Sequence, residues 1–584
     1  MINIKENKEL NIINHSCAHI MAQAVKHLFP EAKFWVGPVI EEGFYYDIDL
    51  GDKTLTEEDL TNIEKEMKRI IKDGKRIIRE EITKSEALEK FKDDPYKIDL
   101  INRMDESDTV ISCYTQGDFT DLCRGPHVET TKECKYFKLL KFSGAYWKGD
   151  AKNKMLQRIY GVCFKTEEDL NKHLEELKDA QERDHRKIGK DLGIFLIDDL
   201  VGKGLPMYLP NGFVMWNTLE NYIREKEIKR GYKHVLTPPI GNVELYKTSG
   251  HWEHYQENMF PKMEVDDEEF VLRPMNCPHH MVIYGSELHS YRDLPLRIAE
   301  IARDARYEAS GALKGIQRVR TFCQNDSHIF CTPEQIESEF KSVVDLILEV
   351  YKEMNIKNYR FELSLRDPED KVKYYPDDEM WNNAENKLRE VLNDLKLDYV
   401  EKIGEAAFYG PKLDVQVKPA VGPEYTLSTC QLDFCLPMRF DLSYIDSDGT
   451  KKTPVVIHRA ILGSIDRFMA FYLEETKGVL PLWLAPIEIN ILPVNNEYHL
   501  DYAKELSAKL EKEGYRVNLD CREEKLGYRL RDAVVKKIPV TIILGQKEVD
   551  DKTISYREFG SEKTTTLTYK DFIKYLEKRI KNKN

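Results

Sequence analysis

Four residues in the N-terminal region have the side-chain types and the spacing of a metal site. His15 and His19 are four positions apart, so on a helix both imidazoles face the same side. Cys123 and His127 repeat that spacing in a second segment. Together they have the ligand types of a four-coordinate zinc site. Histidines packed in a helical interface would account for the same residues without a metal.

Three segments in the middle of the chain carry arginines and aromatic residues in a fixed order. The first is Gly231–Pro238, a helix end followed by a strand. The second begins at Arg306-Tyr-Glu308 and continues through a glycine-containing loop to Arg318–Phe322. The third is Gly463–Arg467, which opens a helix after the strand Val455–Ile457. In this order they resemble motifs 1, 2 and 3 of the class II aminoacyl-tRNA synthetases.

That resemblance implies an attack by an amino-acid carboxylate on the α-phosphate of ATP. Arginine suits this reaction because its guanidinium is planar, permanently charged and bidentate. Arg306, Arg467 and Gln431 are implied as catalytic, with Arg306 on the α-phosphate and the carboxylate. Phe322 is implied to stack on adenine and Glu308 to read its amino group, with Mg²⁺ bridging the phosphates. The residues implied for ATP binding are Arg306, Glu308, Arg318, Phe322 and Arg467.

Four further segments resemble the threonyl-tRNA synthetase family, and this resemblance covers nearly the whole chain. They are Arg273–His280, Asn325–Thr332, Phe408–Lys412 and Ile457–Ser464. The family's zinc ligands fall on Cys277, His328 and His458, with one Zn²⁺ expected per subunit. Their separations along the chain are too long for spacing to have found them, so the motif match alone selects them.

A thiolate and two imidazoles leave one zinc coordination position open, which is typical of a functional site. Threonine can fill that position with its amino group and β-hydroxyl, whereas valine has no hydroxyl to offer. The resemblance implies that Met275, Asp326, Tyr409 and Gln431 line the threonine pocket. His279 and His280, beside Cys277, are interpreted as packing residues at a helix start.

Serine has the hydroxyl and lacks only a methyl group, which is worth about 1–3 kcal/mol, roughly 10- to 200-fold. A second, hydrolytic site is therefore expected. The N-terminal segments, with Phe142–Trp147, resemble the editing domain shared by threonyl and alanyl enzymes. The implied editing residues are His15, His19, Lys97, Asp121, Cys123 and His127. We favour hydrolysis of Ser-tRNA without a bound metal, and the four-ligand zinc site remains the alternative.

The C-terminal segment resembles the anticodon-binding domain of the threonyl, prolyl, histidyl and glycyl enzymes. The matching segments are Cys521–Arg529 and Gly545–Val549, and by position Glu548 and Arg557 are candidates for anticodon contact. The net charge of −14 argues against a nonspecific nucleic-acid binder. Basic residues nevertheless outnumber acidic ones after residue 485, as a surface that meets RNA requires.

The elements that must position these residues are visible as hydrophobic periodicity and capping signals. Asn14 is predicted to cap the helix that carries His15 and His19. Thr56 and Asp59 form a predicted capping box for a helix that ends at Gly74. A charged helix from Thr166 to about Lys190 has few apolar positions and is interpreted as a bridge between domains. A helix is also expected over Pro333–Glu353.

The expected fold is α+β and multidomain. It comprises an N-terminal α+β editing domain over 1–165, a helical linker over 166–190, and a class II catalytic domain with an antiparallel sheet over 191–484. Residues 485–584 alternate strands and helices, which predicts an α/β anticodon-binding domain with a mostly parallel sheet. Motif 1 builds the dimer interface in class II enzymes, so a homodimer is expected.

The 584 residues contain no long apolar run and no signal-peptide pattern, and the 11 cysteines form no CxxC pair. A cytoplasmic protein that binds tRNA(Thr), ATP and L-threonine, with no membrane, is therefore expected. Many family members begin with a ubiquitin-like domain for which these residues leave no room, whether through natural absence or removal. Full aminoacylation is expected without it. The rivals are a seryl or prolyl enzyme, and a paralogue that binds RNA without catalysis.

Overall fold

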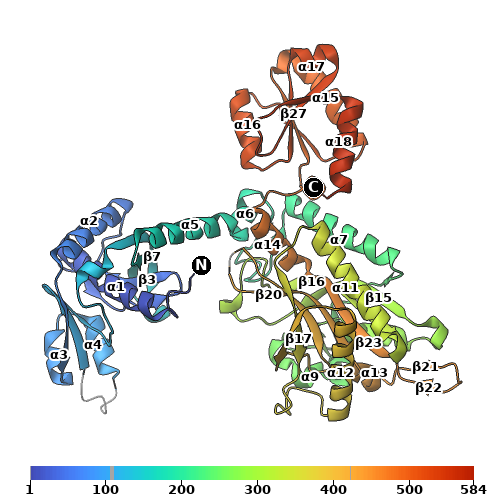
Figure 1. Ribbon diagram of the computed structural model, residues 1–584, viewed down its shortest axis with the longest axis horizontal. Coiled ribbons are helices and arrows are strands. Elements are labelled where there is room, and N and C mark those ends of the chain that lie inside the picture. The colour runs from blue at the N-terminus through green and yellow to red at the C-terminus, as the bar shows by residue number, and fades with distance from the viewer. Residues whose placement is uncertain (1, 105–110, 151, 421, 584) are drawn as a thin grey trace. The chain divides into compact units, whose positions relative to one another are not determined.

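The computed structural model describes residues 2–104, 111–150, 152–420 and 422–583. The chain forms two compact units, Met1–Asp179 and Ala180–Asn584. Both combine helices with antiparallel or mixed sheets (Figure 1), which confirms the predicted α+β class. Among the described residues, no helix has the length and apolar composition needed to cross a bilayer.

The first unit is built on helix α1 (Lys8–Leu28), which contacts a five-stranded antiparallel sheet. The strands pair in the order β1-β3-β8-β7, and β2 pairs with β3. Their bounds are β1 (Lys33–Phe34), β2 (Val39–Ile40), β3 (Gly43–Asp49), β7 (Tyr136–Tyr146) and β8 (Met155–Phe164). Every residue of α1 from Ser16 to Val25 is buried, so this part of the helix is enclosed on all sides and His19 is fixed in the interior.

The prediction that Asn14 caps α1 is wrong, because the helix begins earlier and Asn7 is its N-cap. Asn14 lies inside the helix and is fully buried. The side-chain nitrogen of Asn14 donates to the backbone carbonyl of Cys163, and its side-chain oxygen accepts from the backbone amide of Cys163, both at 2.8 Å. Asn14 therefore fastens α1 to β8.

Helix α2 (Glu57–Asp73) has the predicted ends. Thr56 accepts from the amide of Asp59, and the Asp59 carboxylate accepts in return from the amide of Thr56, which completes the capping box. Gly74 ends the helix with φ of 66°, a left-handed conformation that glycine adopts without strain. Both predictions are confirmed.

A second, three-stranded sheet with order β4-β5-β6, together with the helices and loops beside it, holds the remaining N-terminal site residues. Its elements are β4 (Ile77–Ile82), α3 (Lys84–Lys90), α4 (Pro95–Asn102), β5 (Ile111–Gln116) and β6 (Phe119–Leu122), with a 3₁₀ turn at Thr131–Cys134. Lys97 lies on α4 and Asp121 on β6. Both side chains are buried.

The charged segment predicted as one helix from Thr166 to about Lys190 is two helices. Helix α5 (Glu167–Arg183) is capped by Thr166, whose hydroxyl accepts from the amide of Asp169. Helix α6 (His185–Asp191) then begins with Asp184 as its N-cap. The new cap at Asp184 is the physical reason that the first helix does not continue.

The sheet of the second unit that corresponds to the predicted catalytic domain has eight strands, in the order β11-β15-β16-β23-β20-β19-β17-β18. The inner pairs are antiparallel, and the two outermost pairs are parallel. The bounds are β11 (Lys233–His234), β15 (Leu296–Ala305), β16 (Thr321–Cys331), β17 (Tyr359–Leu365), β18 (Tyr399–Ile403), β19 (Lys412–Val417), β20 (Tyr425–Asp433) and β23 (Val455–Ser464). The predicted antiparallel catalytic sheet is confirmed.

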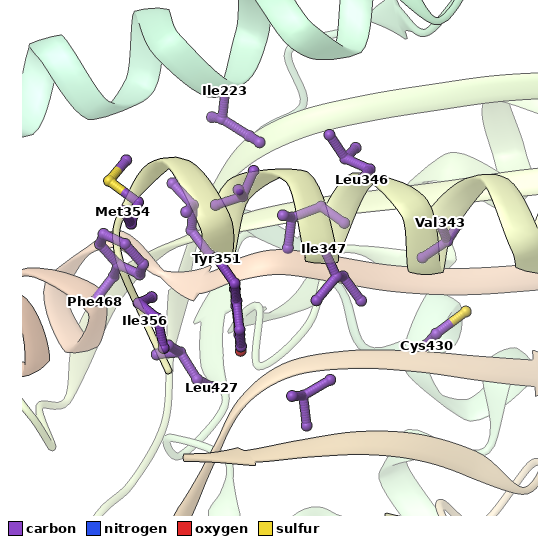
Figure 2. Close-up of a cluster of buried hydrophobic side chains, with 14 of the residues drawn as sticks. Ile223, Val343, Leu346, Ile347, Tyr351, Met354, Ile356, Leu427, Cys430 and Phe468 are labelled. Atoms are coloured by element: carbon purple, nitrogen blue, oxygen red, sulfur yellow. The ribbon is translucent and has the colours of Figure 1, made fainter. Parts of the chain in front are cut away.

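Helix α11 (Ile336–Glu353) packs on this sheet and forms its main hydrophobic core. Figure 2 shows Val343, Ile347 and Tyr351 of α11 directed toward the strands, where Leu427 and Cys430 meet them. The residues Pro333–Gln335, predicted as the start of this helix, form a 3₁₀ turn instead. Helices α7 (Pro210–Lys229) and α14 (Ile465–Thr476) complete the core.

Further elements surround the sheet, and one of them carries a site residue. They are β9 (Phe195–Leu196), β10 (Met207–Tyr208), β12 (Ile240–Asn242), α8 (Val243–Ser249), α9 (His251–His254), β13 (Met263–Val265), β14 (Glu268–Leu272), α10 (Cys277–Gly285), α12 (Asp378–Asp394), α13 (Cys435–Arg439), β21 (Tyr444–Ile445) and β22 (Lys451–Lys452). Helix α10 matters most for the site, because Cys277 is its first residue.

The C-terminal part forms a five-stranded sheet in the order β25-β24-β26-β27-β28. The pairs β24–β25 and β24–β26 are parallel, and the pairs β26–β27 and β27–β28 are antiparallel. The sheet is therefore mixed, whereas a mostly parallel sheet was predicted. The elements are β24 (Ile489–Pro493), α15 (Asn496–Lys512), β25 (Val517–Leu519), α16 (Leu526–Val535), β26 (Val540–Leu544), α17 (Gln546–Asp551), β27 (Thr553–Glu558), β28 (Thr565–Thr568) and α18 (Tyr569–Lys581). The short connection from β27 to β28 allows only an antiparallel pair.

Candidate active and editing sites

The three predicted zinc ligands come together in the catalytic sheet. His328 on β16 and His458 on β23 are direct cross-strand partners, and Cys277 approaches from the start of α10. One ligand atom from each residue lies within 4.8 Å of the others. Their exposed fractions are 2% for Cys277, 0% for His328 and 4% for His458. The fold therefore joins residues that are far apart in sequence.

The hydrogen bonds of this cluster fit a metal ion. His458 Nε2 lies 2.8 Å from the carboxylate of Asp433, which leaves Nδ1 free to bind. His328 Nε2 is buried and has no hydrogen-bond partner. An unpaired buried nitrogen is costly, and coordination to a cation would satisfy it. One sulfur and two imidazole nitrogens are ligands that zinc accepts.

A cavity of about 310 Å³ opens beside the cluster. Its lining includes all four predicted threonine-pocket residues, Met275, Asp326, Tyr409 and Gln431. The Tyr409 hydroxyl donates to Gln431 Oε1, and its ring stacks on His458 with centroids 4.8 Å apart. Burial raises the pKa of Asp326 to about 8, and the nearby Asp304 adds to the shift. A cation bound beside Asp326 would lower that pKa again.

A second cavity of about 220 Å³ is lined by all five predicted ATP-binding residues, Arg306, Glu308, Arg318, Phe322 and Arg467. Five residues line both cavities, namely Arg306, Gln324, Lys412, Thr429 and Gln431, so the two cavities adjoin. Gln324 and Lys412 were not among the predicted site residues. Lys412 is the last residue of Phe408–Lys412, a segment that resembles the family, so the sequence held a usable signal for it. Gln324 had no such signal.

The second cavity concentrates positive charge. The guanidinium carbon of Arg306 lies 4.9 Å from the centre of the Phe322 ring. Arg318 Nε donates to the Glu308 carboxylate at 2.8 Å. The pKa of Arg467 is lowered, first by burial and then by repulsion from Arg306 and Arg318. A site in which cations repel one another gains most when an anion binds.

Motif 3 depends on Gly463 for its shape. This residue has φ of 63°, and a Cβ atom there would lie 2.4 Å from the carbonyl oxygen of Leu427. A side chain would therefore strain the backbone and push β23 away from β20. Because Arg467 follows one turn later on α14, the glycine fixes where that guanidinium enters the cavity.

The N-terminal cluster is also assembled as predicted. Cys123 Sγ lies 3.2 Å from His15 Nε2 and 3.2 Å from His127 Nε2. Ligand atoms of His15, His19, Cys123 and His127 all lie within 4.8 Å of one another. The other nitrogen of His127, Nδ1, meets the Ser16 hydroxyl at 3.1 Å. Ser16 was missed at the sequence level, since one serine on a helix gives no signal.

Lys97 and Asp121 complete this cluster. Lys97 Nζ lies 2.5 Å from Asp121 Oδ1, and His19 Nε2 lies 3.7 Å from Asp121 Oδ2. The hydroxyl of Tyr46, also missed at the sequence level, donates to the same carboxylate. Burial opposes ionisation of Asp121, but Lys97 and His19 outweigh it and lower its pKa. All six predicted editing residues therefore lie in one site.

Burial makes the remaining groups of this site neutral. It lowers the pKa of His19 to about 4 and raises the pKa of the Cys123 thiol to about 12. Burial is also the main reason that the pKa values of His15 and His127 are lowered. Neutral imidazoles beside a protonated thiol can accept hydrogen bonds from a water molecule and hold it in place.

The two anticodon candidates lie near each other on one side of the C-terminal sheet. Glu548 on α17 accepts from the Ser555 hydroxyl at 2.7 Å and from the Gly545 amide at 2.9 Å. Arg557 is two residues after Ser555 on β27, so the side chains of Ser555 and Arg557 project from the same face of the sheet. A carboxylate and a guanidinium on one face can read base edges.

Comparisons with known proteins decide the family. The chain is 54% identical to a threonine–tRNA ligase from Geobacillus sp. (strain WCH70), over 98% of this chain and 89% of the relative. It is 56% identical to the threonine–tRNA ligase of Staphylococcus epidermidis, over 97% of this chain and 87% of that one. The chain belongs to the threonine–tRNA ligase family.

The domain models and a solved structure agree with this family. Residues 260–476 match the class II tRNA synthetase core domain for G, H, P, S and T, and residues 488–579 match an anticodon-binding domain. Residues 111–160 match the second additional domain of threonyl and alanyl tRNA synthetases. A crystal structure of the RNA binding domain of threonyl-tRNA synthetase from Cryptosporidium parvum Iowa II is 36% identical with a TM-score of 0.65, covering 68% of this chain and 98% of that one. The seryl and prolyl alternatives are thereby excluded.

Proposed function

We propose that the two adjoining cavities of the catalytic sheet activate L-threonine with ATP and charge tRNA(Thr), and that the N-terminal cluster hydrolyses Ser-tRNA(Thr). Membership of the threonine–tRNA ligase family establishes the ligase activity and its editing. The residue assignments rest on one observation. The wall that holds Cys277 and His458 also contains Arg306 and Gln431, which belong to the arginine-rich cavity as well.

Arg306 can act on both substrates because it borders both cavities. Its guanidinium would hold the threonine carboxylate and the α-phosphate, which must be in contact for the attack to occur. Negative charge increases on the phosphate oxygens in the transition state, and a preorganised arginine stabilises it there. Gln431, held by Tyr409, would orient the threonine amino group and carboxylate.

The other residues of the second cavity would bind the remaining parts of ATP. Phe322 would stack on adenine, and Glu308 would read its amino group after Arg318 turns toward phosphate. Arg318 and Arg467 would bind the β- and γ-phosphates, which carry Mg²⁺ with them. The Arg318–Glu308 ion pair is half-exposed on the arginine side, so little free energy is lost when it breaks.

Cys277, His328 and His458 would hold a Zn²⁺ ion in the threonine pocket. Such an ion, when bound, supplies a Lewis-acid position that accepts an amino group and a hydroxyl but not a methyl group. Asp326 lies in the same pocket wall and would accept a hydrogen bond from the β-hydroxyl. Met275 would close the apolar side of the pocket against the threonine methyl group.

The editing site is proposed to work without metal. The Cys123 thiol already has His15 and His127 as partners, and Asp121 has Lys97, His19 and Tyr46. Each group is thus satisfied within the protein, apart from Nδ1 of His19. A water molecule bound between the neutral imidazoles would attack the carbonyl carbon of the serine ester. The bond from that carbon to the ribose oxygen of the tRNA breaks, and the ribose oxygen takes up the proton that the water loses.

The chain is proposed to act as a homodimer, with its domains at 1–165, 166–190, 191–484 and 485–584. Large apolar side chains are exposed around motif 1, with Leu236 at 91% and Ile240 at 40%. Exposed apolar side chains that cluster in this way mark a protein interface. Glu548 and Arg557 would contact the anticodon.

Threonine-dependent exchange of pyrophosphate into ATP tests the proposal. The purified chain should support exchange with threonine, more weakly with serine, and hardly at all with valine. Arg306→Lys should lower the rate by about 100-fold or more, because lysine cannot bind carboxylate and phosphate together in bidentate geometry. Tight RNA binding without threonine-dependent exchange would instead indicate a regulator that has lost catalysis.

A further inference from the structure

We infer that His280 is a positioning residue for the metal centre, acting with Glu300 to fix the tautomer of His328. The inference rests on the proposed zinc site. His280 was interpreted from the sequence as a packing residue at the start of α10. It is indeed fully buried there, but both of its ring nitrogens also meet polar groups.

The contacts form a chain that leads away from the metal position. His328 Nδ1 lies 2.7 Å from His280 Nδ1, and their rings are nearly perpendicular at 89°. His280 Nε2 lies 3.3 Å from Oε2 of Glu300. The exposed fractions are 0% for His280 and His328 and 1% for Glu300, so water does not mediate these contacts from the surface.

Glu300 is held as an acceptor. Its carboxylate accepts from the amide and the hydroxyl of Thr237, at 3.0 and 2.7 Å. Arg273 Nη2 lies 3.4 Å away and supplies a positive charge. A carboxylate with these partners carries no proton of its own. The hydrogen bond to His280 Nε2 must therefore be donated by the imidazole.

The positions of the remaining protons follow from that donor. With its proton on Nε2, a neutral His280 presents a lone pair at Nδ1. The short contact to His328 Nδ1 then requires His328 to donate from that atom. This leaves the lone pair of His328 on Nε2, the buried nitrogen that has no hydrogen-bond partner and lies 4.0 Å from Asp326 Oδ2. Glu300 thus determines, through His280, which nitrogen of His328 can bind a metal.

Asn276 offers a competing arrangement that the same geometry disfavours. Its Nδ2 lies 3.3 Å from His280 Nε2 and 3.5 Å from Glu300 Oε2. If Asn276 donated to the ring, the proton of His280 would move to Nδ1 and His328 would be left with the wrong tautomer. A carboxylate is a stronger acceptor than a neutral ring nitrogen, so both His280 and Asn276 donate to Glu300.

The other histidine ligand is oriented without such an intermediate. His458 Nε2 contacts the Asp433 carboxylate directly at 2.8 Å. Asp433 is fixed in turn by the amides of Cys435 and Leu436. The centre therefore combines one direct carboxylate–histidine pair with one pair extended by a second histidine. The extended pair depends on a residue with an acceptor at the position of His280 Nδ1.

Two substitutions of similar polarity test the two ring nitrogens of His280 separately. In His280→Asn the amide oxygen can occupy the position of Nδ1 and accept from His328. In His280→Gln the amide reaches toward Glu300 instead, and His328 loses its acceptor. Zinc affinity should be measured by competition with a chromophoric chelator, and the Co²⁺-substituted proteins compared by their visible absorption.

We expect His280→Gln to raise the zinc dissociation constant by about 10- to 100-fold, whereas His280→Asn stays close to the unchanged protein. Equal zinc affinity in all three proteins, or equal losses in both variants, would overturn the inference. If His280→Gln does not fold, Glu300→Gln tests the same proton arrangement from its far end. Zinc binding should weaken there too, and an unchanged dissociation constant would again contradict the role of His280.

The same measurements separate this inference from the zinc site itself. The unchanged chain should bind zinc, and Cys277→Ser should abolish that binding. Failure of that control would remove the proposed metal site. A normal control with unaffected His280→Gln would remove only the positioning role.

Discussion

Lys97 Nζ and Asp121 Oδ1 are 2.5 Å apart in a site where both side chains are almost fully buried, with exposed fractions of 4% and 2%. A buried ion pair is costly to break because the remaining charge has no water around it. Lys97 also donates to the Trp35 carbonyl and the Tyr46 hydroxyl, which hold it in place without neutralising it. The stability and the chemistry of this site thus depend on one carboxylate.

Replacing that carboxylate should therefore change the stability and activity of the unit Met1–Asp179 alone, which we call the editing unit. We expect Asp121→Asn to destabilise it by about 3–5 kcal/mol and to stop hydrolysis of Ser-tRNA, while threonine charging continues. Asp118→Asn is the matched control, since the Asp118 side chain is 71% exposed and should cost about 1 kcal/mol or less. Hydrogen exchange in β5 and β6 reports the stability. Equal exchange in the two variants would contradict the prediction.

The sequence was informative where a local rule acts on neighbouring residues. The capping box of Thr56 and Asp59 and the glycine at position 74 involve contacts within one helix, so spacing alone identifies them. The prediction for Asn14 was wrong because asparagine favours helix ends only when nothing else competes. Here two hydrogen bonds to Cys163 on a distant strand hold Asn14 inside the helix.

The catalytic ligands and their supports show a second limit. Cys277, His328 and His458 were found by family resemblance, and the sheet register explains their meeting only once the structure is known. The partners that orient them could not be assigned from the sequence. His280 stands beside Cys277 and was interpreted as a packing residue, and Glu300 lies in a different element with no characteristic spacing to it. Such outer contacts depend on packing geometry, which the chain order does not contain.

Stability of the editing unit should depend on pH through His27. Burial lowers its pKa, but hydrogen bonds to Asp118 and Glu66 outweigh this and raise the pKa above 6.5. The stabilisation is therefore fully present below pH 6.5 and is lost as pH rises through the folded pKa. Between about pH 6 and pH 8 we expect a loss of up to about 1 kcal/mol.

His27→Gln should abolish that pH dependence, because glutamine keeps a polar side chain that does not titrate. Hydrogen exchange of α1 and α2 at several pH values measures it. A variant that loses stability over the same range as the unchanged chain would show that another group is responsible.

The zinc content of variants distinguishes the two clusters. If the editing cluster is free of metal, the unchanged chain binds one zinc and Cys277→Ser binds none. Threonine-dependent exchange in Cys277→Ser should fall by more than the roughly 10- to 100-fold that loss of an outer partner causes. Elemental analysis that found two zinc ions in the unchanged chain, and one in Cys277→Ser, would support the four-ligand zinc site instead.

Removing the sulfur and one imidazole of the editing cluster should show how well the threonine pocket alone rejects serine. In Cys123→Ala combined with His127→Ala, threonine charging should be unchanged and Ser-tRNA should accumulate. Selection against serine would then rest on one methyl group, roughly 10- to 200-fold. Cys113→Ala, at a buried thiol on the neighbouring strand β5, is the control and should not accumulate Ser-tRNA.

The exposed apolar side chains near motif 1 predict how the proposed dimer would dissociate. Leu236 is 91% exposed in the single chain, so Leu236→Asp should fold normally but place a charge inside the interface. Val400→Asp is the control, because Val400 is 51% exposed on β18, at the opposite edge of the sheet from β11. Light scattering should show a dimer for the unchanged chain and the control, and a monomer for Leu236→Asp. A monomeric unchanged chain, or a dimeric Leu236→Asp, would exclude an interface at this edge.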